Sequence, residues 1–351
     1  MQSFLIIKVL FFATLAFAFT WLWTPLLTHF LYKYKMGKQI RNNGSTPIFS
    51  SLHATKAGTP TMGGVLIWVT TLLFSMLFFY LGIFFPETIF SKLNFLTQKE
   101  TLLPLGALVI TALIGLFDDW LDVRGKGVLG GGGLQMRHRL LIYSLIAVVG
   151  AWWFYFKLDW TVLHIPFFGN YEIGWWYIPF FIFVIIATAF SVNEIDGLDG
   201  LAGGTLLMAY AAYGVIAFAL GRYELATFCG VIIGALLAFL WFNINPARFI
   251  MGDTGSMSLG VTLGIIAMLT NYALLLPVIG FLFVVESLSV ILQLASKKFR
   301  RGKKIFLSSP IHHHFQAIGW SEPKIVMRFW VISGVTSAIG LTLFLLDISI
   351  K

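Results

Sequence analysis

Acidic residues and histidines stand beside the ends of long apolar segments in this chain. Charged groups near a bilayer cost free energy unless they pair with a partner. Several such groups from distant parts of the sequence therefore indicate one shared site, and carboxylates supply the oxygen ligands that hard divalent cations prefer. We expect a metal-dependent site for an anionic substrate. The residues are Asp118, Asp119, Asp122, Glu194, Asp196, Asp199, Asp253, His312, His313 and His314.

Two adjacent carboxylates, Asp118 and Asp119, end an apolar run. Such a pair can share Mg²⁺, which keeps several waters in its shell. Asp122 lies four residues after Asp118 and shares its face if the helix continues. The alternative is a solvated or capped helix end.

The segment 193–200 combines Asn193 with two carboxylates and two glycines. Asp196 and Asp199 are three residues apart, so on a helix they share a face. Gly197 and Gly200 let a ligand approach the backbone, and a helix N-terminus suits phosphate. The alternative is N-capping, for which one Asp suffices.

Asp253 is the single carboxylate of the loop that contains Asn243 and Met251-Gly252-Asp253-Thr254-Gly255. It is a candidate metal ligand whose shell diphosphate and water complete. An ordinary Asp-Gly turn is the alternative.

The histidines of Pro310-Ile311-His312-His313-His314-Phe315 are consecutive, so on a helix they point to different sides. We therefore expect hydrogen bonds to phosphate or sugar rather than one zinc ion. Lys56 precedes a glycine-rich turn and offers a point charge for phosphate. Glu286 lies within an apolar run and is either functional or bonded to a neighbouring helix.

The elements that position these residues are membrane spans. The 351 residues are 58% hydrophobic and 11% charged, whereas soluble domains carry about 25% charged residues. Spans need about 20 apolar residues, and backbone in lipid must be helical. We predict an all-α polytopic protein, a single domain over 1–351, with ten spans. They are 4–31, 62–85, 102–117, 140–156, 175–192, 201–220, 225–242, 257–270, 273–295 and 328–349.

Lys and Arg set the orientation. Of the 24, all but Lys8, Lys92, Lys99, Lys157, Arg222 and Lys351 follow odd-numbered spans. Those loops are therefore cytoplasmic, together with the acidic residues and histidines given in the opening paragraph, and both termini are periplasmic. The net charge of +9 fits loops and anionic lipid rather than nucleic acid. The first apolar stretch is too long for a cleaved leader. Lone Cys229 allows no intrachain disulfide.

Residues 125–130 match GxGxxG but follow no strand, which argues against a dinucleotide site.

Taken together, the motifs resemble the phospho-N-acetylmuramoyl-pentapeptide transferases of the polyprenyl-phosphate N-acetylhexosamine-1-phosphate transferase superfamily. The matching pieces, in the family's order, are Lys56 with 58–64, Asp118-Asp119, Asn193 with 196–200, Asn243, Met251-Gly252-Asp253, and Pro310 with 312–315. The triple histidine and the Gly-Thr-Pro-Thr-Met-Gly-Gly run point to the muramoyl-pentapeptide branch.

The resemblance implies that UDP-N-acetylmuramoyl-pentapeptide and undecaprenyl phosphate give lipid I and UMP at a bacterial cytoplasmic membrane, with Mg²⁺ as cofactor. It implies Asp253 and Asp119 as metal ligands, and Asp118, Asp119, Asp253 and His312 as catalytic. It also implies a broken ninth helix beside a lipid groove. The implied substrate-binding residues are Lys56, Thr61, Arg137, Asn193, Asp196, Gly197, Leu198, Asp199, Asn243, Ile250 and His313.

The chain departs from the family's pattern in three places. Glu194-Ile195 replaces the usual Leu-Thr, and Ile250 replaces an aromatic that stacks on uracil, with Phe249 one step earlier. The glycines at 130–133 replace a lysine-rich loop, which moves phosphate contacts to Arg137 or Arg139.

For the reaction we expect direct attack by the lipid phosphate, already largely ionised since its second pKa is about 6, with Asp118 positioning it or removing a residual proton. A covalent aspartyl intermediate is the alternative. Rival functions are a transferase using UDP-N-acetylglucosamine, an anionic-solute transporter, and a non-catalytic lipid-binding scaffold. The oligomeric state, including a homodimer, stays open.

Overall fold

The computed structural model describes residues 2–37, 56, 58–125 and 133–350, and in these ranges it is a bundle of helices with one short hairpin. The GxGxxG segment lies mostly outside them. The membrane-length helices are α1 (Gln2–Lys33), α3 (Val65–Phe84), α5 (Leu102–Val123), α6 (Met136–Trp152), α7 (Tyr177–Ile195), α8 (Leu201–Ala219), α9 (Tyr223–Asn243) and α14 (Glu322–Ile350). The shorter ones are α4 (Ile89–Leu93), α10 (Asp253–Leu269), α11 (Leu276–Ile279), α12 (Phe281–Phe299) and α13 (Ile311–Ala317).

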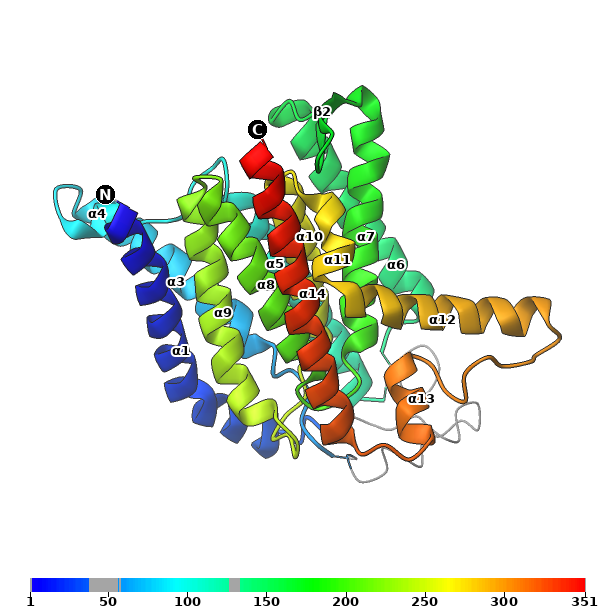
Figure 1. The fold of residues 1–351 in the computed structure, drawn as a ribbon. Coiled ribbons are helices and arrows are strands. Elements are labelled where there is room, and N and C mark those ends of the chain that lie inside the picture. The colour runs from blue at the N-terminus through cyan, green and yellow to red at the C-terminus, as the bar shows by residue number, and fades with distance from the viewer. Residues whose placement is uncertain (1, 38–55, 57, 126–132, 351) are drawn as a thin grey trace.

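The membrane fold predicted from the apolar runs is confirmed. By length and composition eight helices of the described ranges can cross a membrane, or nine if a bent pair is one span. Helix α10 supplies a further, shorter apolar helix. The bent pair joins Ala273–Ile279 to Phe281–Phe299 at 81°, which confirms the expected break in the ninth segment. The bend falls at Gly280, and α12 runs across the bundle rather than along it (Figure 1).

Helix α10 is the centre of the bundle. Every residue from Thr254 to Leu269 is buried, and the helix lies against α5 and α7. Gly260 and Gly264, four residues apart, face α7 so closely that an added Cβ would lie 2.9 Å from Ala189 Cα and 2.5 Å from Thr188 Oγ1. Small residues at this spacing let helix backbones approach each other within a membrane.

The third apolar run forms a longer helix than predicted. Helix α5 continues to Val123, so Asp118, Asp119 and Asp122 lie on its last turns rather than beyond its end. Because the chain stays helical, Asp122 shares the face of Asp118, as expected.

The expectation that Asp196 and Asp199 share a helical face is wrong. Helix α7 ends at Ile195 and α8 begins at Leu201, so both carboxylates lie in the turn between them. Gly200 has a φ of 82°, in the left-handed region that glycine adopts at little cost. This turn sends the two side chains to different partners.

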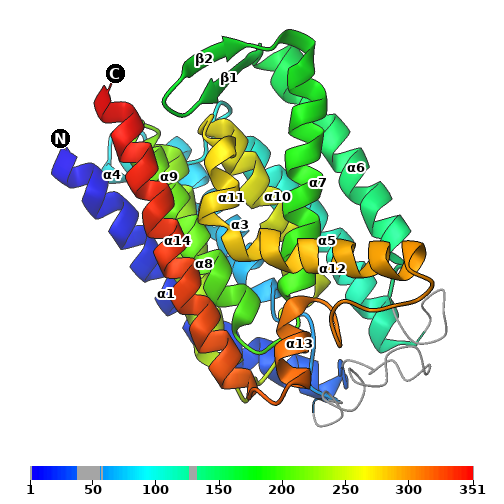
Figure 2. The same cartoon turned by 45° about the vertical axis from the view of Figure 1, so that its right-hand side comes forward.

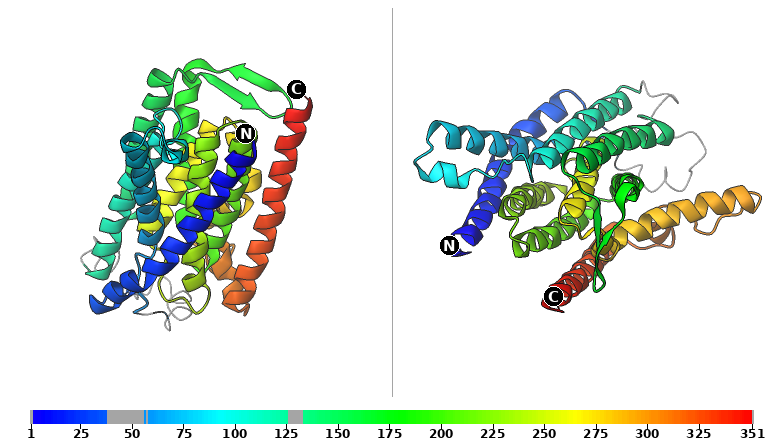
Figure 3. Two further views of the ribbon diagram at one scale, coloured as in Figure 1. Left: turned by 90° about the vertical axis from the view of Figure 1, so that its left-hand side faces the viewer. Right: turned by 90° about the horizontal axis from the view of Figure 1, so that it is seen from above.

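A hairpin that the apolar pattern does not predict covers the end of the bundle where both termini lie (Figures 1 and 3). Strands β1 (Val162–Ile165) and β2 (Gly169–Glu172) pair antiparallel, with Val162 opposite Glu172. The hairpin extends from α7 towards the end of α14 (Figure 2). Short π- and 3₁₀-helical turns, Trp153–Lys157, Gly174–Trp176 and Ala273–Leu275, adjoin it and the α10–α11 corner.

One carboxylate of α14 fastens this hairpin. Asp347 Oδ2 lies 2.8 Å from His164 Nε2 and accepts from Tyr272 Oη at 2.6 Å, and Asp347 Oδ1 accepts from Phe167 N at 2.6 Å. His164 and Asp347 are both buried. We call this set of contacts the Asp347 clasp.

Candidate active site

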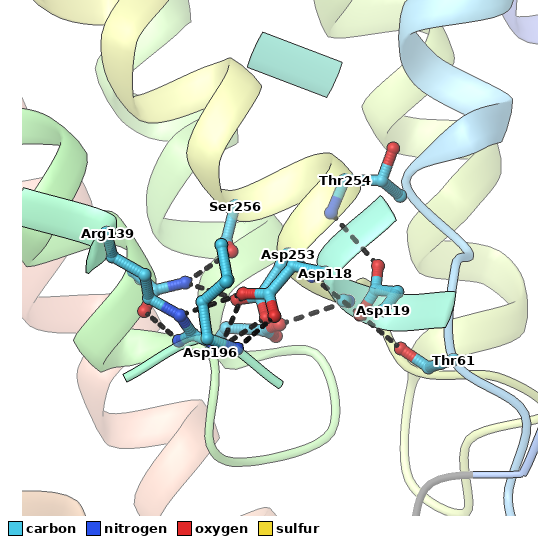
Figure 4. Close-up of polar contacts among 11 residues, drawn as sticks. Thr61, Asp118, Asp119, Arg139, Asp196, Asp253, Thr254 and Ser256 are labelled. Atoms are coloured by element: carbon cyan, nitrogen blue, oxygen red, sulfur yellow. Dashed lines mark hydrogen bonds and ion pairs between the residues drawn. The ribbon is translucent and has the colours of Figure 1, made fainter. Parts of the chain in front are cut away.

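Asp119 of α5 caps the first turn of α10. Its Oδ1 accepts from Asp253 N at 3.0 Å and its Oδ2 from Thr254 N at 3.0 Å. Thr61 Oγ1 donates to Oδ1 at 3.1 Å (Figure 4). Free N–H groups and the helix dipole at an N-terminus both favour a carboxylate. Asp119 therefore fixes the backbone that carries Asp253.

The two helices approach each other closely at this point because α5 has Gly115 one turn before Asp119. A Cβ on Gly115 would lie 2.3 Å from the backbone oxygen of Asp253. The close approach sets the carboxylates of Asp118 and Asp253 on a common side.

Arg139 of α6 joins these carboxylates. Its Nε donates to Asp118 Oδ2 at 2.9 Å, its Nη2 to Asp253 Oδ2 at 2.6 Å, and its Nη1 to Asn193 Oδ1 at 2.9 Å (Figure 4). The planar guanidinium suits such forked contacts. Asn193 in turn donates to Asp253 Oδ1 at 2.6 Å and to Ser256 Oγ at 3.0 Å. Four helices, α5, α6, α7 and α10, thus meet around one positive charge.

The donor set of this centre can be compared with what a divalent cation prefers. Asp118, Asp253 and Asn193 offer only oxygen acceptors and an amide to this centre. The described ranges contain no group of three or more His, Cys, Asp or Glu residues with metal-site geometry. Mg²⁺ needs no such cage, since one or two carboxylates, substrate phosphates and water commonly hold it. These residues therefore fit Mg²⁺ shared with a diphosphate.

The turn 196–200 is anchored on both sides. Asp196 Oδ2 accepts from Gly252 N at 3.2 Å, which places Asp196 beside the Asp253 loop. Asp199 Oδ2 accepts from Asn245 Nδ2 at 3.0 Å and from Ala247 N at 3.1 Å. Leu198, which lies between these two residues in the sequence, is buried.

Asn243, at the end of α9, binds the same turn. Its Oδ1 accepts from Gly200 N at 2.9 Å, and its Nδ2 donates to Phe249 O at 2.8 Å. The amide therefore joins the 196–200 turn to the loop before Asp253. This contact gives Asn243 a structural role whatever it binds.

Lys56 lies at the far side of that turn. Its Nζ is 2.6 Å from Asp199 Oδ1 and 2.5 Å from Glu322 Oε1. Glu322 was missed by sequence reasoning. In the sequence Glu322 resembles an ordinary surface carboxylate, because Lys324 and Arg328 follow it on the same helix and no motif surrounds it.

The three histidines do point to different partners, as expected. His312 Nδ1 lies 3.0 Å from Glu286 Oε2, His313 Nδ1 is 2.9 Å from Gln316 Oε1, and His314 Nδ1 accepts from Leu307 N at 3.2 Å. Complete burial lowers the pKa of His312 to about 3, and the positive charge of Lys56 contributes.

His312 also borders the 196–200 turn. A Cβ on Gly197 would lie 2.2 Å from His312 Nε2, so glycine is required for the imidazole to lie against this backbone. Glu286 is fully buried, and its Oε2 lies 3.0 Å from His312 Nδ1 at the start of α13. It therefore lies beside a neighbouring helix, and whether it also has a functional role stays a prediction.

Two predicted residues lie differently from the rest. Ile250 is bound through its backbone: its N–H donates to Pro60 O at 2.8 Å and its C=O accepts from Gly63 N at 2.9 Å. Phe249 is buried against Phe239 and Phe242, so its ring is not free to stack on a base. Arg137 is exposed, while Arg139, two residues later, enters the cluster.

Known proteins resemble the chain across this site. The profile described as glycosyl transferase family 4 matches residues 101–271, and signature 1 of phospho-N-acetylmuramoyl-pentapeptide-transferase matches residues 56–67. The transferase of that name from Chloroflexus aggregans is 37% identical over 97% of this chain and 90% of its own length. The chain belongs to the phospho-N-acetylmuramoyl-pentapeptide-transferase family. As a member it is a membrane-embedded phospho-sugar transferase.

Two further relatives give the same result. The phospho-N-acetylmuramoyl-pentapeptide-transferase of a Geobacillus species is 39% identical over 93% of this chain and 95% of its own length. That of Listeria monocytogenes is 38% identical over 92% and 94%. The profile match contains Asp118, Asp119, Asn193 and Asp253, and the signature begins at Lys56. The family resemblance therefore covers the residues that the fold gathers.

Proposed function

We propose that the protein transfers phospho-N-acetylmuramoyl-pentapeptide from its UDP derivative to undecaprenyl phosphate, releasing UMP and forming lipid I for peptidoglycan synthesis. The reaction takes place at the cytoplasmic face of the bacterial inner membrane. Family membership supports the substrate pair. The observation that carries the proposal is the convergence of Asp118, Asn193 and Asp253 on Arg139, from four helices, at the end of the bundle opposite both termini.

The chemistry demands such a centre. A phosphate-monoester oxygen attacks the β-phosphorus of the UDP-sugar, a new P–O bond forms, and the bond from that phosphorus to the bridging oxygen breaks. UMP leaves with the electron pair. Both reactants are anions, so cationic groups must reduce their repulsion. Bound Mg²⁺ supplies charge neutralisation to the diphosphate and the leaving oxygen.

The chain's own residues carry the remaining tasks. Asp253 and Asp118 are the proposed carboxylates for the metal and for positioning the lipid phosphate, and Asp119, also a proposed ligand, holds Asp253 in place through the α10 backbone. Lys56 and Arg139 are the cations that face phosphates. Asp196, Gly197, Leu198 and His313 would line the nucleotide-sugar side. His312 is neutral at physiological pH because its pKa is about 3, so it is suited to donate or accept a hydrogen bond rather than to add charge.

The test is UMP release by purified protein in detergent, given undecaprenyl phosphate and either UDP-N-acetylmuramoyl-pentapeptide or UDP-N-acetylglucosamine. Of the two UDP-sugars, only UDP-N-acetylmuramoyl-pentapeptide is expected to support activity. This activity is expected to disappear when a chelator is added and to return when Mg²⁺ is restored. Asp253→Asn is expected to lower kcat by about a hundredfold or more. Glu172→Gln, an exposed carboxylate on the hairpin, is the matched control and keeps wild-type activity. Metal-independent turnover, or turnover of the glucosamine substrate instead, overturns the proposal.

A further inference from the structure

Glu322, the first residue of α14, closes a ring of contacts at the 196–200 turn. Its Oε1 accepts from the backbone N–H of Asp199 at 2.6 Å and lies 2.5 Å from Lys56 Nζ. Asp199 Oδ1 lies 2.6 Å from the same ammonium. One side chain therefore fixes both the lysine and the backbone of the lysine's other partner.

The ring is largely removed from solvent. The exposed fractions of the side chains are 17% for Lys56, 8% for Asp199 and 12% for Glu322. Charge-assisted hydrogen bonds are stronger than neutral ones, and a partly buried setting strengthens them further. The position of the Lys56 ammonium therefore depends strongly on both carboxylates.

The two carboxylates are not equivalent. Asp199 also accepts from Asn245 and Ala247 through its Oδ2, so its side chain stays fixed without Lys56. Glu322 reaches the ring from a different helix, at the start of a long span. Glu322 therefore links α14 both to Lys56 and to the backbone of the 196–200 turn.

We propose that Glu322 is a positioning residue for the transfer reaction: it holds the Lys56 ammonium at the nucleotide-sugar side of the site. This inference rests on the proposed function, in which Lys56 faces a substrate phosphate. A simpler role also exists, because an acidic residue at a helix N-terminus stabilises the helix by itself. The two roles differ in what the loss of the charge changes.

Glu322→Gln separates them. Glutamine keeps an oxygen that can accept from Asp199 N–H but loses the negative charge beside Lys56. If Glu322 positions Lys56, KM for the UDP-sugar rises roughly ten- to hundredfold, while KM for the lipid phosphate and the Tm stay near wild type. Glu322→Asp, which keeps the charge on a shorter side chain, recovers part of the loss. If Glu322 only caps α14, the Tm falls and both KM values stay unchanged.

A double-mutant cycle tests whether the effect passes through Lys56. Binding of UDP-N-acetylmuramoyl-pentapeptide is measured by calorimetry for wild type, Lys56→Met, Glu322→Gln and the double variant. Coupled residues give non-additive losses, so the double variant is expected to bind no more weakly than Lys56→Met alone. Additive losses, or an unchanged KM in Glu322→Gln, overturn the inference. Where Glu322→Gln fails to fold, the same readouts on Glu322→Asp decide, with a raised UDP-sugar KM at unchanged Tm expected.

The outcome separates this inference from the proposed function. A wild-type protein that releases no UMP contradicts the function. A wild-type protein that is active, with Glu322→Gln indistinguishable from it, contradicts only the role of Glu322.

Discussion

Asn193 Nδ2 donates to Asp253 Oδ1 at 2.6 Å, which joins the last turn of α7 to the first residue of α10. The contact leaves Asp253 Oδ2 for Arg139. A residue near the end of one helix thus orients a carboxylate at the start of another.

Removing the guanidinium of Arg139 leaves Asp118 and Asp253 facing each other without their shared cation. Breaking a buried charge pair costs about 3–5 kcal/mol, so Arg139→Met is expected to lower the Tm. It is also expected to reduce the rate of UMP release by about a hundredfold or more. Arg139→Lys keeps the charge but not the planar fork, and is expected to recover part of both. Thermal unfolding and initial rates measure the effects. Wild-type turnover in Arg139→Met contradicts the prediction.

The contact between α5 and α10 leaves no room for a side chain at Gly115. An added Cβ would lie 2.3 Å from Asp253 O and 2.7 Å from Thr254 Cα, both backbone atoms that cannot rotate away. Gly115→Ala is expected to lower the free energy of unfolding by about 1–3 kcal/mol and to reduce kcat by displacing Asp253.

Gly106→Ala is the matched control, because it lies on the same helix with nothing within 4 Å of the added Cβ. Alanine is the better helix former, so the control is expected to be neutral or stabilising. Equal Tm values for the two variants contradict the argument from contact.

The free energy of unfolding is expected to decrease as the pH is lowered, because His312 is buried in its neutral form. Burial lowers its pKa to about 3, whereas an unfolded histidine titrates near 6.5. Between these values the unfolded chain binds more protons, so this group subtracts about 1.4 kcal/mol from the free energy of unfolding for each pH unit below about 6.5. Above that pH its contribution is constant.

The measurement is unfolding of wild type and His312→Gln at several pH values from 7.5 to 5. The difference between the two proteins reports His312 together with its contact to Glu286, and wild type is expected to lose more stability on acidification. A difference that stays flat over this range contradicts the buried neutral imidazole.

The Asp347 clasp is expected to matter for stability and not for catalysis. Asp347→Ala leaves His164, Tyr272 Oη and Phe167 N without their shared acceptor. The free energy of unfolding is expected to fall by about 3–5 kcal/mol, while kcat and both KM values at moderate temperature stay within about twofold, because the clasp lies at the opposite end of the bundle. Exposed Asp159→Asn is the control for Tm. A large change in KM with an unchanged Tm contradicts this assignment.

The apolar runs predicted the spans well because backbone in lipid has almost no choice but helix. The convergence of Asp118, Asn193, Asp196 and Asp253 could be predicted because all four lie at the ends of predicted spans that were placed on the same side. For residues 196–200 the spacing predicts a helix, because spacing alone does not reveal that Gly200 adopts a positive φ.

Side-chain direction was harder to predict than position. Arg137 and Arg139 stand at the start of α6, two residues apart and therefore about 200° apart around it. Only one of them faces α5 and α7, and no pattern in the sequence chooses which. The partners of Glu322 and Asp347 come from segments at least 75 residues away, so only the fold reveals them.

Helix α14 carries Glu322 at its first residue and Asp347 near its last. The 25 steps between them (347 − 322), at about 1.5 Å each, span roughly 38 Å, more than the hydrocarbon thickness of about 30 Å. The helix is therefore a strut fastened on both membrane faces. For protein engineering, a truncation at residue 346 removes the contacts of Asp347 while sparing those of Glu322, so a fusion partner belongs after Lys351.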